Sequence, residues 1–246
     1  MTETADSTLV VIPTYNELES LPLVVAGLLG LERDLEILVV DDNSPDGTGD
    51  WADNFAAGDA RLTVLHRTVK EGLGPAYVAG FRWALERGYG TIVEMDADGS
   101  HRVDQLPLLL AAVESGASLA IGSRWIPGGS IVNWPWYRQA ISRIGTSYAR
   151  IMLHSSLHDI TSGFRAFSRS ALESADVSTL SAAGYAFQIE LAWRIERQGL
   201  PIAEVPITFV EREFGRSKMT TRIVMEALSK VTSWGLRGLP KSPPAS

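Results

Sequence analysis

Strands and helices alternate regularly through the first half of this 246-residue chain, and this alternation limits the fold more than any other feature. Five continuous apolar runs predict strands buried on both faces, at Leu9–Pro13, Leu35–Val40, Leu62–Leu65, Thr91–Met95 and Ser118–Gly122. Four segments between them predict helices, at Glu17–Leu29, Thr48–Ala57, Pro75–Arg87 and Val103–Glu114. Such alternation predicts an α/β fold with a doubly wound, mostly parallel, Rossmann-like sheet. Ligands bind such sheets at the carboxyl ends of the strands.

The second half of the chain has a different character. Residues 124–136 are rich in Gly, Pro and Trp and predict a loop. We then expect helices at Tyr137–Leu153 and Tyr185–Gln198, a strand at Pro201–Val210 and a tail helix at Thr221–Trp234. We therefore predict one domain over 1–246, divided into a half at 8–122, a half at 123–220, an amphipathic tail at 221–238 and a disordered end at 239–246.

Composition excludes several classes of partner and site. The formal net charge of −7 argues against nucleic acid as a partner. The stretch from Arg124 to Arg150 nevertheless holds four arginines and no acid, which favours a local anionic partner. The chain has no cysteine, so any metal must be held by oxygen or histidine. We see no secretory signal and no apolar run of about 18 residues, so we expect no membrane-spanning helix.

A pair of carboxylates, Asp96 and Asp98, directly follows the predicted strand Thr91–Met95. Carboxylates two residues apart beyond a strand end can converge, and Mg²⁺ typically takes one or two carboxylates plus substrate phosphates. The plain alternative is an Asp-rich turn before the next helix. The position at a strand end favours a metal site.

Two further polar loops, Pro13–Glu17 and Asp41–Gly47, follow the first and second predicted strands. Nucleotide recognition requires an aromatic face for the base and oxygen groups for ribose hydroxyls and ring N–H groups. The alternative is helix capping, since Asn16 and Asp46 are ordinary cap and turn residues. Three such loops at one rim favour a binding site over three separate caps.

Seven motifs in register resemble family-2 glycosyltransferases, and among these the dolichol- and polyprenol-phosphate mannose synthases. The motifs are PTYNE, DDNSPDGT, KEGLGPAYVAGF, DADGSH, GSRW, DITSGFRAFSR and EVPITF with the following GRSKM. The resemblance covers about residues 8–220. It implies a type-A glycosyltransferase fold with C-terminal acceptor-binding helices, in which 8–122 binds a GDP-sugar and 123–220 binds the acceptor.

The resemblance also implies roles for single residues. The residues that would bind the nucleoside are Pro13, Tyr15, Glu17 and Asp42. Asp96 and Asp98 would hold Mg²⁺ or Mn²⁺ together with the diphosphate. Some relatives carry a further metal ligand, Gln, where this chain has Ser100; a hydroxyl is a weaker ligand, and a bridging water is an equal alternative.

Several polar residues match family positions around the donor diphosphate and the acceptor phosphate, namely Arg124, Arg138, Ser142, Arg212 and Lys218. Two phosphate-bearing substrates repel each other, so fixed cations are needed between them. For Arg138 the alternative is a solvated helix face, and for Lys218 a plain surface loop. Catalysis is assigned to Asp98, Arg124, Arg138 and Ser142. Five more family-like positions receive no role: Asp159, Ser162, Gly163, Gln188 and Glu190.

The reaction implied is inverting transfer of mannose from GDP-mannose to a polyprenyl monophosphate of the dolichyl type. Three alternatives stay open: a polyprenyl-phosphate glucosyltransferase or other UDP-sugar enzyme, a non-catalytic nucleotide-sugar-binding module, and a scaffolding subunit. A separate membrane-anchoring subunit is a further possible partner.

An aromatic cluster beside two arginines could be core or a membrane-interface belt; its members are Trp125, Trp134, Trp136 and Tyr137. We predict the interface, and with it a cytoplasmic enzyme bound peripherally to the cytoplasmic face of the membrane. The apolar stripe of the tail helix is instead predicted to be ordinary core. His101, His154 and His158 lack the spacing of metal ligands and are interpreted as loop or cap residues.

Overall fold

The computed structural model describes residues 7–180, 184, 186–212 and 221–238, with the side chains of 221 and 222 excepted. A seven-stranded sheet forms its centre, in the order β3-β2-β1-β4-β7-β5-β8. All neighbouring strands run parallel except β7, which is antiparallel to both of its neighbours. The strands are β1 (Thr8–Thr14), β2 (Leu35–Asp41), β3 (Leu62–His66), β4 (Thr91–Glu94), β5 (Leu119–Ser123), β7 (Arg165–Ser168) and β8 (Ile202–Pro206). The predicted doubly wound, mostly parallel sheet is confirmed.

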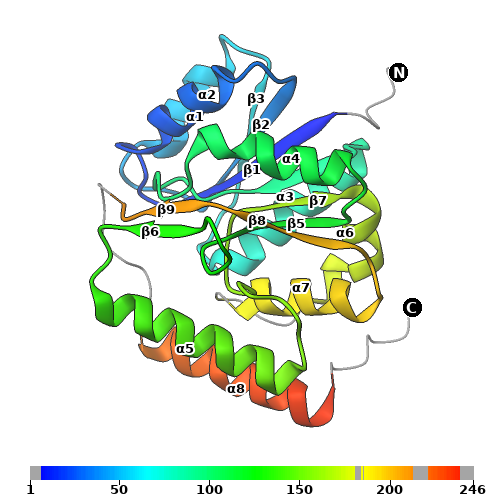
Figure 1. Cartoon of the computed structure of the whole chain (residues 1–246). Helices are drawn as coiled ribbons and strands as arrows, with labels where there is room; N and C mark the ends of the chain where they lie inside the picture. The colour runs from blue at the N-terminus through cyan, green and yellow to red at the C-terminus, as the bar shows by residue number, and fades with distance from the viewer. Residues whose placement is uncertain (1–6, 181–183, 185, 213–220, 239–246) are drawn as a thin grey trace.

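Helices cover both faces of the sheet (Figure 1). Successive residues of a strand point to opposite faces, and the two hydrophobic cores follow this alternation. Val11 and Val40 belong to one core, and Val10 and Val39 to the other. The helices are α1 (Leu21–Leu29), α2 (Thr48–Ala56), α3 (Leu73–Arg87), α4 (Leu106–Glu114), α5 (Trp136–Leu153), α6 (Arg169–Ala175), α7 (Ala186–Arg197) and α8 (Thr221–Arg237).

Two predicted helix starts need correction. Helix α1 begins at Leu21 rather than Glu17, because the Glu17 backbone N–H donates to Thr48 Oγ1 (3.0 Å) and is held in a loop. Helix α3 begins at Leu73, so Pro75 is its third residue rather than its first. The predicted end of α3 is confirmed, since Gly88 takes the left-handed conformation (φ 85°) that suits glycine.

Strand β7 and helix α6 were not predicted. Strand β7 has only four residues and includes a charged one, so its apolar signal is weak. It lies between β4 and β5, which would otherwise have been expected to pair directly. The inserted strand places Arg165 opposite Glu94 in the interior of the sheet.

The predicted single strand Pro201–Val210 is wrong, because the chain breaks at Ile207. Strand β8 ends at Pro206, and β9 (Thr208–Val210) pairs instead with β6 (Ser130–Val132), inside the segment predicted to be a loop. Ile207 is fully buried and packs against Gly122, where a Cβ would lie only 3.0 Å from its side chain. This break directs Arg212 toward Asp98 at the carboxyl end of the sheet.

Helices α5 and α8 lie side by side below the sheet (Figure 1). Gly235 allows close approach, since a Cβ there would lie 2.4 Å from the Met152 carbonyl oxygen. Val231 and Trp234 of α8 are buried, as predicted, whereas the stripe residues nearer its start, such as Val224 and Leu228, are half-buried and line a cavity. Among the described helices, none has the length and apolar character needed to cross a membrane.

Candidate active site

The loops after β1 and β2 are tied together at the carboxyl rim of the sheet. Thr14 Oγ1 donates to Asp41 Oδ1 (2.9 Å), and the Asn16 backbone N–H donates to Ser44 Oγ (3.1 Å). Asp46 accepts from the backbone and hydroxyl of Thr48 (3.0 and 2.6 Å), so it has the expected turn role, whereas the N-cap of α2 is Gly47. The rim is therefore a joined structure rather than a set of independent turns.

The residues expected to bind a nucleoside lie on this rim with two cations that sequence reasoning missed. Lys70 Nζ lies 3.5 Å from the centroid of the Tyr15 ring. Arg67 Nη1 lies 2.6 Å from Asp42 Oδ1, and Arg67 also pairs with Glu71. Burial raises the pKa of Asp42, and the Arg67 cation offsets only part of that rise. Lys70 and Arg67 follow β3, whose carboxyl end shares this rim, and that position was the available signal.

The carboxylate pair lies where the chain turns after β4. Asp98 is buried; its Oδ1 accepts from the Ser100 backbone N–H (3.0 Å) and its Oδ2 lies 3.1 Å from Arg212 Nη1. Burial would raise the pKa of Asp98, but the Arg212 cation and the Ser100 hydrogen bonds hold it below its ordinary value. Asp96 Oδ1 accepts from the Tyr77 hydroxyl (3.1 Å).

The donor set suits a hard divalent cation that is shared with a substrate. The described residues contain no group of three or more His, Asp or Glu side chains that could enclose a metal by themselves. Two carboxylates with the buried Ser100 beside them leave coordination positions for phosphate oxygens, as is typical of Mg²⁺. Asp96 and Asp98 therefore fit a metal–diphosphate complex rather than a closed metal site.

His101 packs beneath the loop that carries Asp96 and Asp98 and forms a hydrogen bond with it. It is buried, its ring stacks on Phe164 (centroids 5.0 Å apart), and its Nδ1 accepts the Asp96 backbone N–H (3.2 Å). Burial lowers the pKa of His101 to about 4, so the ring is neutral near pH 7. His101 therefore has a structural role, and it is buried, whereas we expected an ordinary loop or cap residue.

Arg124 is bound by a partner that sequence reasoning left without a role. Its Nε and Nη2 each lie 2.7 Å from an oxygen of Asp159, and Nη2 also donates to Thr161 (3.1 Å). The two charged side chains are 7% and 0% exposed. Both donors of the Arg124 fork are therefore occupied by a buried carboxylate, although Arg124 was expected to meet a phosphate.

Arg138 has a more open environment. Its Nη1 lies 2.5 Å from Glu211 Oε1, with side chains 28% and 32% exposed, and its guanidinium lies 4.6 Å from the Trp134 ring centroid. Ser142 follows one helical turn later, and both residues line a cavity between α5, α8 and the carboxyl end of the sheet. Lys218 lies outside the described residues.

One cavity of about 280 Å³ brings most of these groups together. Its polar lining includes Asp96, Asp98, Arg124, Arg138, Ser142 and Arg212. Its apolar lining comes from the facing sides of α5 and α8, including Ile141, Val224, Leu228 and Val231. The residues predicted to bind the nucleoside are not among its lining and lie on the adjoining rim.

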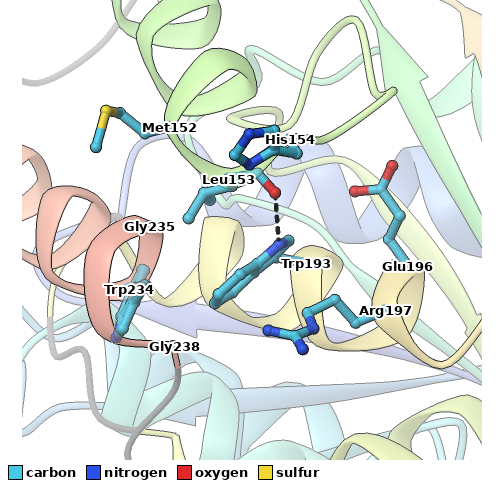
Figure 2. Close-up of a pocket in the computed structure, with 9 residues that line it drawn as sticks. All are labelled: Met152, Leu153, His154, Trp193, Glu196, Arg197, Trp234, Gly235 and Gly238. Carbon is cyan, nitrogen blue, oxygen red and sulfur yellow. Dashed lines mark hydrogen bonds between the residues drawn. The ribbon is translucent and has the colours of Figure 1, made fainter.

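A second cavity of about 440 Å³ lies between the ends of α5, α7 and α8 (Figure 2). Trp193 and Trp234 face it, and Trp193 Nε1 donates to the Leu153 carbonyl (3.0 Å). It is the larger cavity, but none of the predicted site residues lines it. We therefore assign the chemistry to the smaller cavity.

A buried polar network explains two family-like positions behind the site. Gln188 Nε2 donates to Glu94 Oε1 (2.6 Å), and Arg165 Nη1 donates to the Gln188 carbonyl (2.6 Å). A Cβ at Gly163 would lie 2.5 Å from Gln188 Nε2, so a larger residue there would displace the Gln188 amide from its contact with Glu94. Burial raises the pKa of Glu94 to about 8.

Most of the chain matches one known protein family. The family described as "Glycosyl transferase family 2" matches residues 9–175. The chain belongs to glycosyltransferase family 2. The matched residues include the carboxylate pair, Arg124, Arg138 and Asp159.

Curated relatives support the resemblance stated from the sequence. The chain is 57% identical over 228 residues to the undecaprenyl-phosphate mannosyltransferase of Micrococcus luteus, covering 93% of both chains. It is 54% identical over 232 residues to the polyprenol monophosphomannose synthase of Mycolicibacterium smegmatis, covering 94% of this chain and 88% of the relative. It is 35% identical to the dolichol-phosphate mannosyltransferase of Pyrococcus furiosus, covering 90% of this chain and 62% of the relative.

Solved glycosyltransferase structures share the fold. Glucosyl-3-phosphoglycerate synthase from Mycobacterium tuberculosis, solved with Mn²⁺ and UDP-glucose, superposes with a TM-score of 0.68 at 22% identity, covering 98% of this chain and 82% of that one. The predicted type-A glycosyltransferase fold is confirmed.

Proposed function

We propose that this glycosyltransferase transfers mannose from GDP-mannose to a polyprenyl monophosphate with inversion at the anomeric carbon. The observation that carries the proposal is a single cavity whose lining combines a carboxylate pair, arginines and an apolar passage between α5 and α8. Relatives at 54–57% identity named for polyprenol and undecaprenyl phosphate support the acceptor, and their names support mannose.

The donor side uses the rim of the sheet. Asp96 and Asp98 would hold Mg²⁺ or Mn²⁺, which neutralises the charge that develops on the leaving diphosphate. Pro13, Tyr15, Glu17 and Asp42 lie along the adjoining rim and would hold the nucleoside. Arg212, now paired with Asp98, and Lys218 would contact the diphosphate.

The acceptor side uses α5. A phosphate monoester has a second pKa of about 6, so its oxygen is already ionised near neutral pH and requires no strong base. Arg138 and Ser142 would hold this phosphate, and the apolar walls of α5 and α8 suit the prenyl chain that follows it. Catalysis then consists of orientation and electrostatic stabilisation, and one displacement inverts the anomeric centre.

The acceptor requires the enzyme to approach a membrane, since exposing a prenyl chain to water costs about 0.8 kcal/mol per CH₂. Helix α5 exposes three large apolar side chains on one side, namely Trp136, Ile144 and Ile151, with exposed fractions of 80%, 69% and 74%. No acid lies between Arg124 and Arg150 to repel anionic lipids. We propose peripheral docking through this face, on the cytoplasmic side, with or without a separate anchoring subunit.

A donor panel tests the proposal directly. Radiolabelled GDP-mannose and UDP-glucose are each incubated with the enzyme, Mn²⁺ or Mg²⁺ and polyprenyl phosphate, and label is counted in the organic-extractable lipid. We expect label from GDP-mannose only, and none after EDTA. Transfer of label from UDP-glucose would identify the enzyme as a glucosyltransferase instead. Donor binding without any transfer would favour a non-catalytic binding module. Membrane association without donor binding would favour a scaffolding subunit.

A further inference from the structure

An ion pair between Arg138 of α5 and Glu211, just after β9, lies beside the cavity and has no role in the function described so far. Only one guanidinium nitrogen of Arg138 takes part, with Nη1 2.5 Å from Glu211 Oε1. Glu211 is itself fixed, because its backbone N–H donates to the Val132 carbonyl (3.1 Å). The second sheet, β6 with β9, thus determines where the carboxylate lies.

A second contact places an aromatic ring beside the same guanidinium. Arg138 lies 4.6 Å from the Trp134 ring centroid, and Trp134 in turn meets Phe209 of β9 edge-on at 5.2 Å. A cation over an aromatic face is attracted by the ring quadrupole. Arg138 therefore has two restraints, a carboxylate on one nitrogen and an aromatic ring beneath its central carbon.

This arrangement leaves the other edge of Arg138 available. Within the described part of the chain, its Nε and Nη2 form no hydrogen bond with a side chain or carbonyl. Arg124, which lines the same cavity, differs because its Nε and Nη2 are both occupied by Asp159. The Nε–Nη2 edge is the fork that binds two oxygens of a phosphate or carboxylate at once.

We propose that Glu211 and Trp134 are positioning residues that present the Nε–Nη2 edge of Arg138 to the acceptor phosphate. The inference rests on the proposed function in that Arg138 is taken to bind this phosphate. Glu211 acts by occupying Nη1, so the guanidinium meets the phosphate with its rotation already fixed. Preorganisation of this kind lowers the free-energy cost of ordering a long side chain on binding.

The test compares Glu211→Ala with Glu211→Gln, using farnesyl phosphate as a short acceptor and GDP-mannose as donor. Glu211→Ala should raise the KM for farnesyl phosphate about tenfold, which corresponds to about 1.4 kcal/mol, with the KM for GDP-mannose unchanged. Glu211→Gln keeps an oxygen that can accept from Nη1 and should recover most of the loss. Glu114→Ala is the matched control, since it breaks the remote exposed pair with Arg33 and should change neither KM.

Direct binding separates this inference from the proposed function. Farnesyl phosphate is titrated by tryptophan fluorescence without donor or metal, and Glu211→Ala should weaken binding by the same factor as it raises KM. If Glu211→Ala tightens binding, Glu211 competes with the phosphate and the proposal is overturned. In the kinetic test, the proposal is also overturned if both KM values change equally or if Glu211→Gln restores none of the loss. If the wild type binds farnesyl phosphate but transfers no mannose, the proposed function fails while the titration still tests Glu211.

Discussion

The sheet rim and helix α5 each contribute an arginine–carboxylate pair beside the same cavity, and the two pairs differ in solvent exposure. Arg124 and Asp159 are 7% and 0% exposed, and both Nε and Nη2 of the guanidinium donate to the carboxylate. Arg138 and Glu211 are 28% and 32% exposed and are joined by one nitrogen. A buried ion pair cannot be broken without leaving an unsolvated charge, whereas a half-exposed pair joined by one nitrogen leaves the remaining guanidinium donors for a ligand. The rim pair therefore suits a structural role, and the α5 pair suits ligand binding.

The largest effect expected from this difference concerns stability. Arg124→Ala leaves Asp159 as a buried, unpaired charge, which typically costs about 3–5 kcal/mol in the free energy of unfolding. Arg138→Ala should cost less than about 1 kcal/mol. Urea denaturation of both variants measures the difference. A loss for Arg124→Ala no greater than that for Arg138→Ala would remove the structural assignment, and the double variant Arg124→Ala/Asp159→Ala should recover part of the loss.

The second prediction concerns the proposed metal ligands Asp96 and Asp98. Asp98→Ala should lower kcat about 10²–10³-fold, because the diphosphate would leave without its charge being stabilised. Calorimetric titration of Mn²⁺ with GDP present should show the same variant losing metal affinity. EDTA-treated wild type that keeps full activity would exclude the metal role, and an active Asp98→Ala variant would exclude this residue.

The third prediction addresses Arg138 of the α5 pair. Arg138→Ala should raise the KM for a polyprenyl phosphate about 10- to 100-fold, since hydrogen bonds to charged groups contribute about 1.5–3 kcal/mol. The KM for GDP-mannose should stay within about twofold of the wild type on the same argument. Steady-state kinetics with each substrate varied in turn gives both values. Equal rises in the two constants would favour a donor or structural role for Arg138.

The smallest expected effect concerns the outer face of α5, away from both pairs. Trp136→Ser should weaken flotation with phosphatidylglycerol vesicles about tenfold, because partial burial of one large side chain contributes at the low end of about 1.5–3 kcal/mol. Leu23→Ser on α1 is the control, since Leu23 is 64% exposed on another helix and should not matter. Transfer to a short water-soluble acceptor should survive in both variants. If Trp136→Ser floats normally and Leu236→Ser at the end of α8 does not, α8 is the docking element.

Three outcomes show where sequence reasoning succeeded and where it failed. The rim loops were predicted because each follows a strongly apolar strand, so their position follows from topology. Strand β7 was missed because four residues including Arg165 carry little pattern. The break at Ile207 was missed because Pro201–Val210 alternates well enough for one strand, and only packing against Gly122 bends it.

The sequence by itself determined the parallel sheet, the rim and the family, because apolar periodicity and local motifs act over short distances along the chain. It also identified the arginines as a set. Only the tertiary structure decided their separate roles, since Asp159 lies 35 residues from Arg124, and Glu211 lies 73 residues from Arg138. Whether an arginine is available to a ligand depends on the carboxylate that folding brings beside it and on the water that reaches the pair. No local pattern encodes either quantity, because both arise where β9, α5 and the loop before β7 pack together.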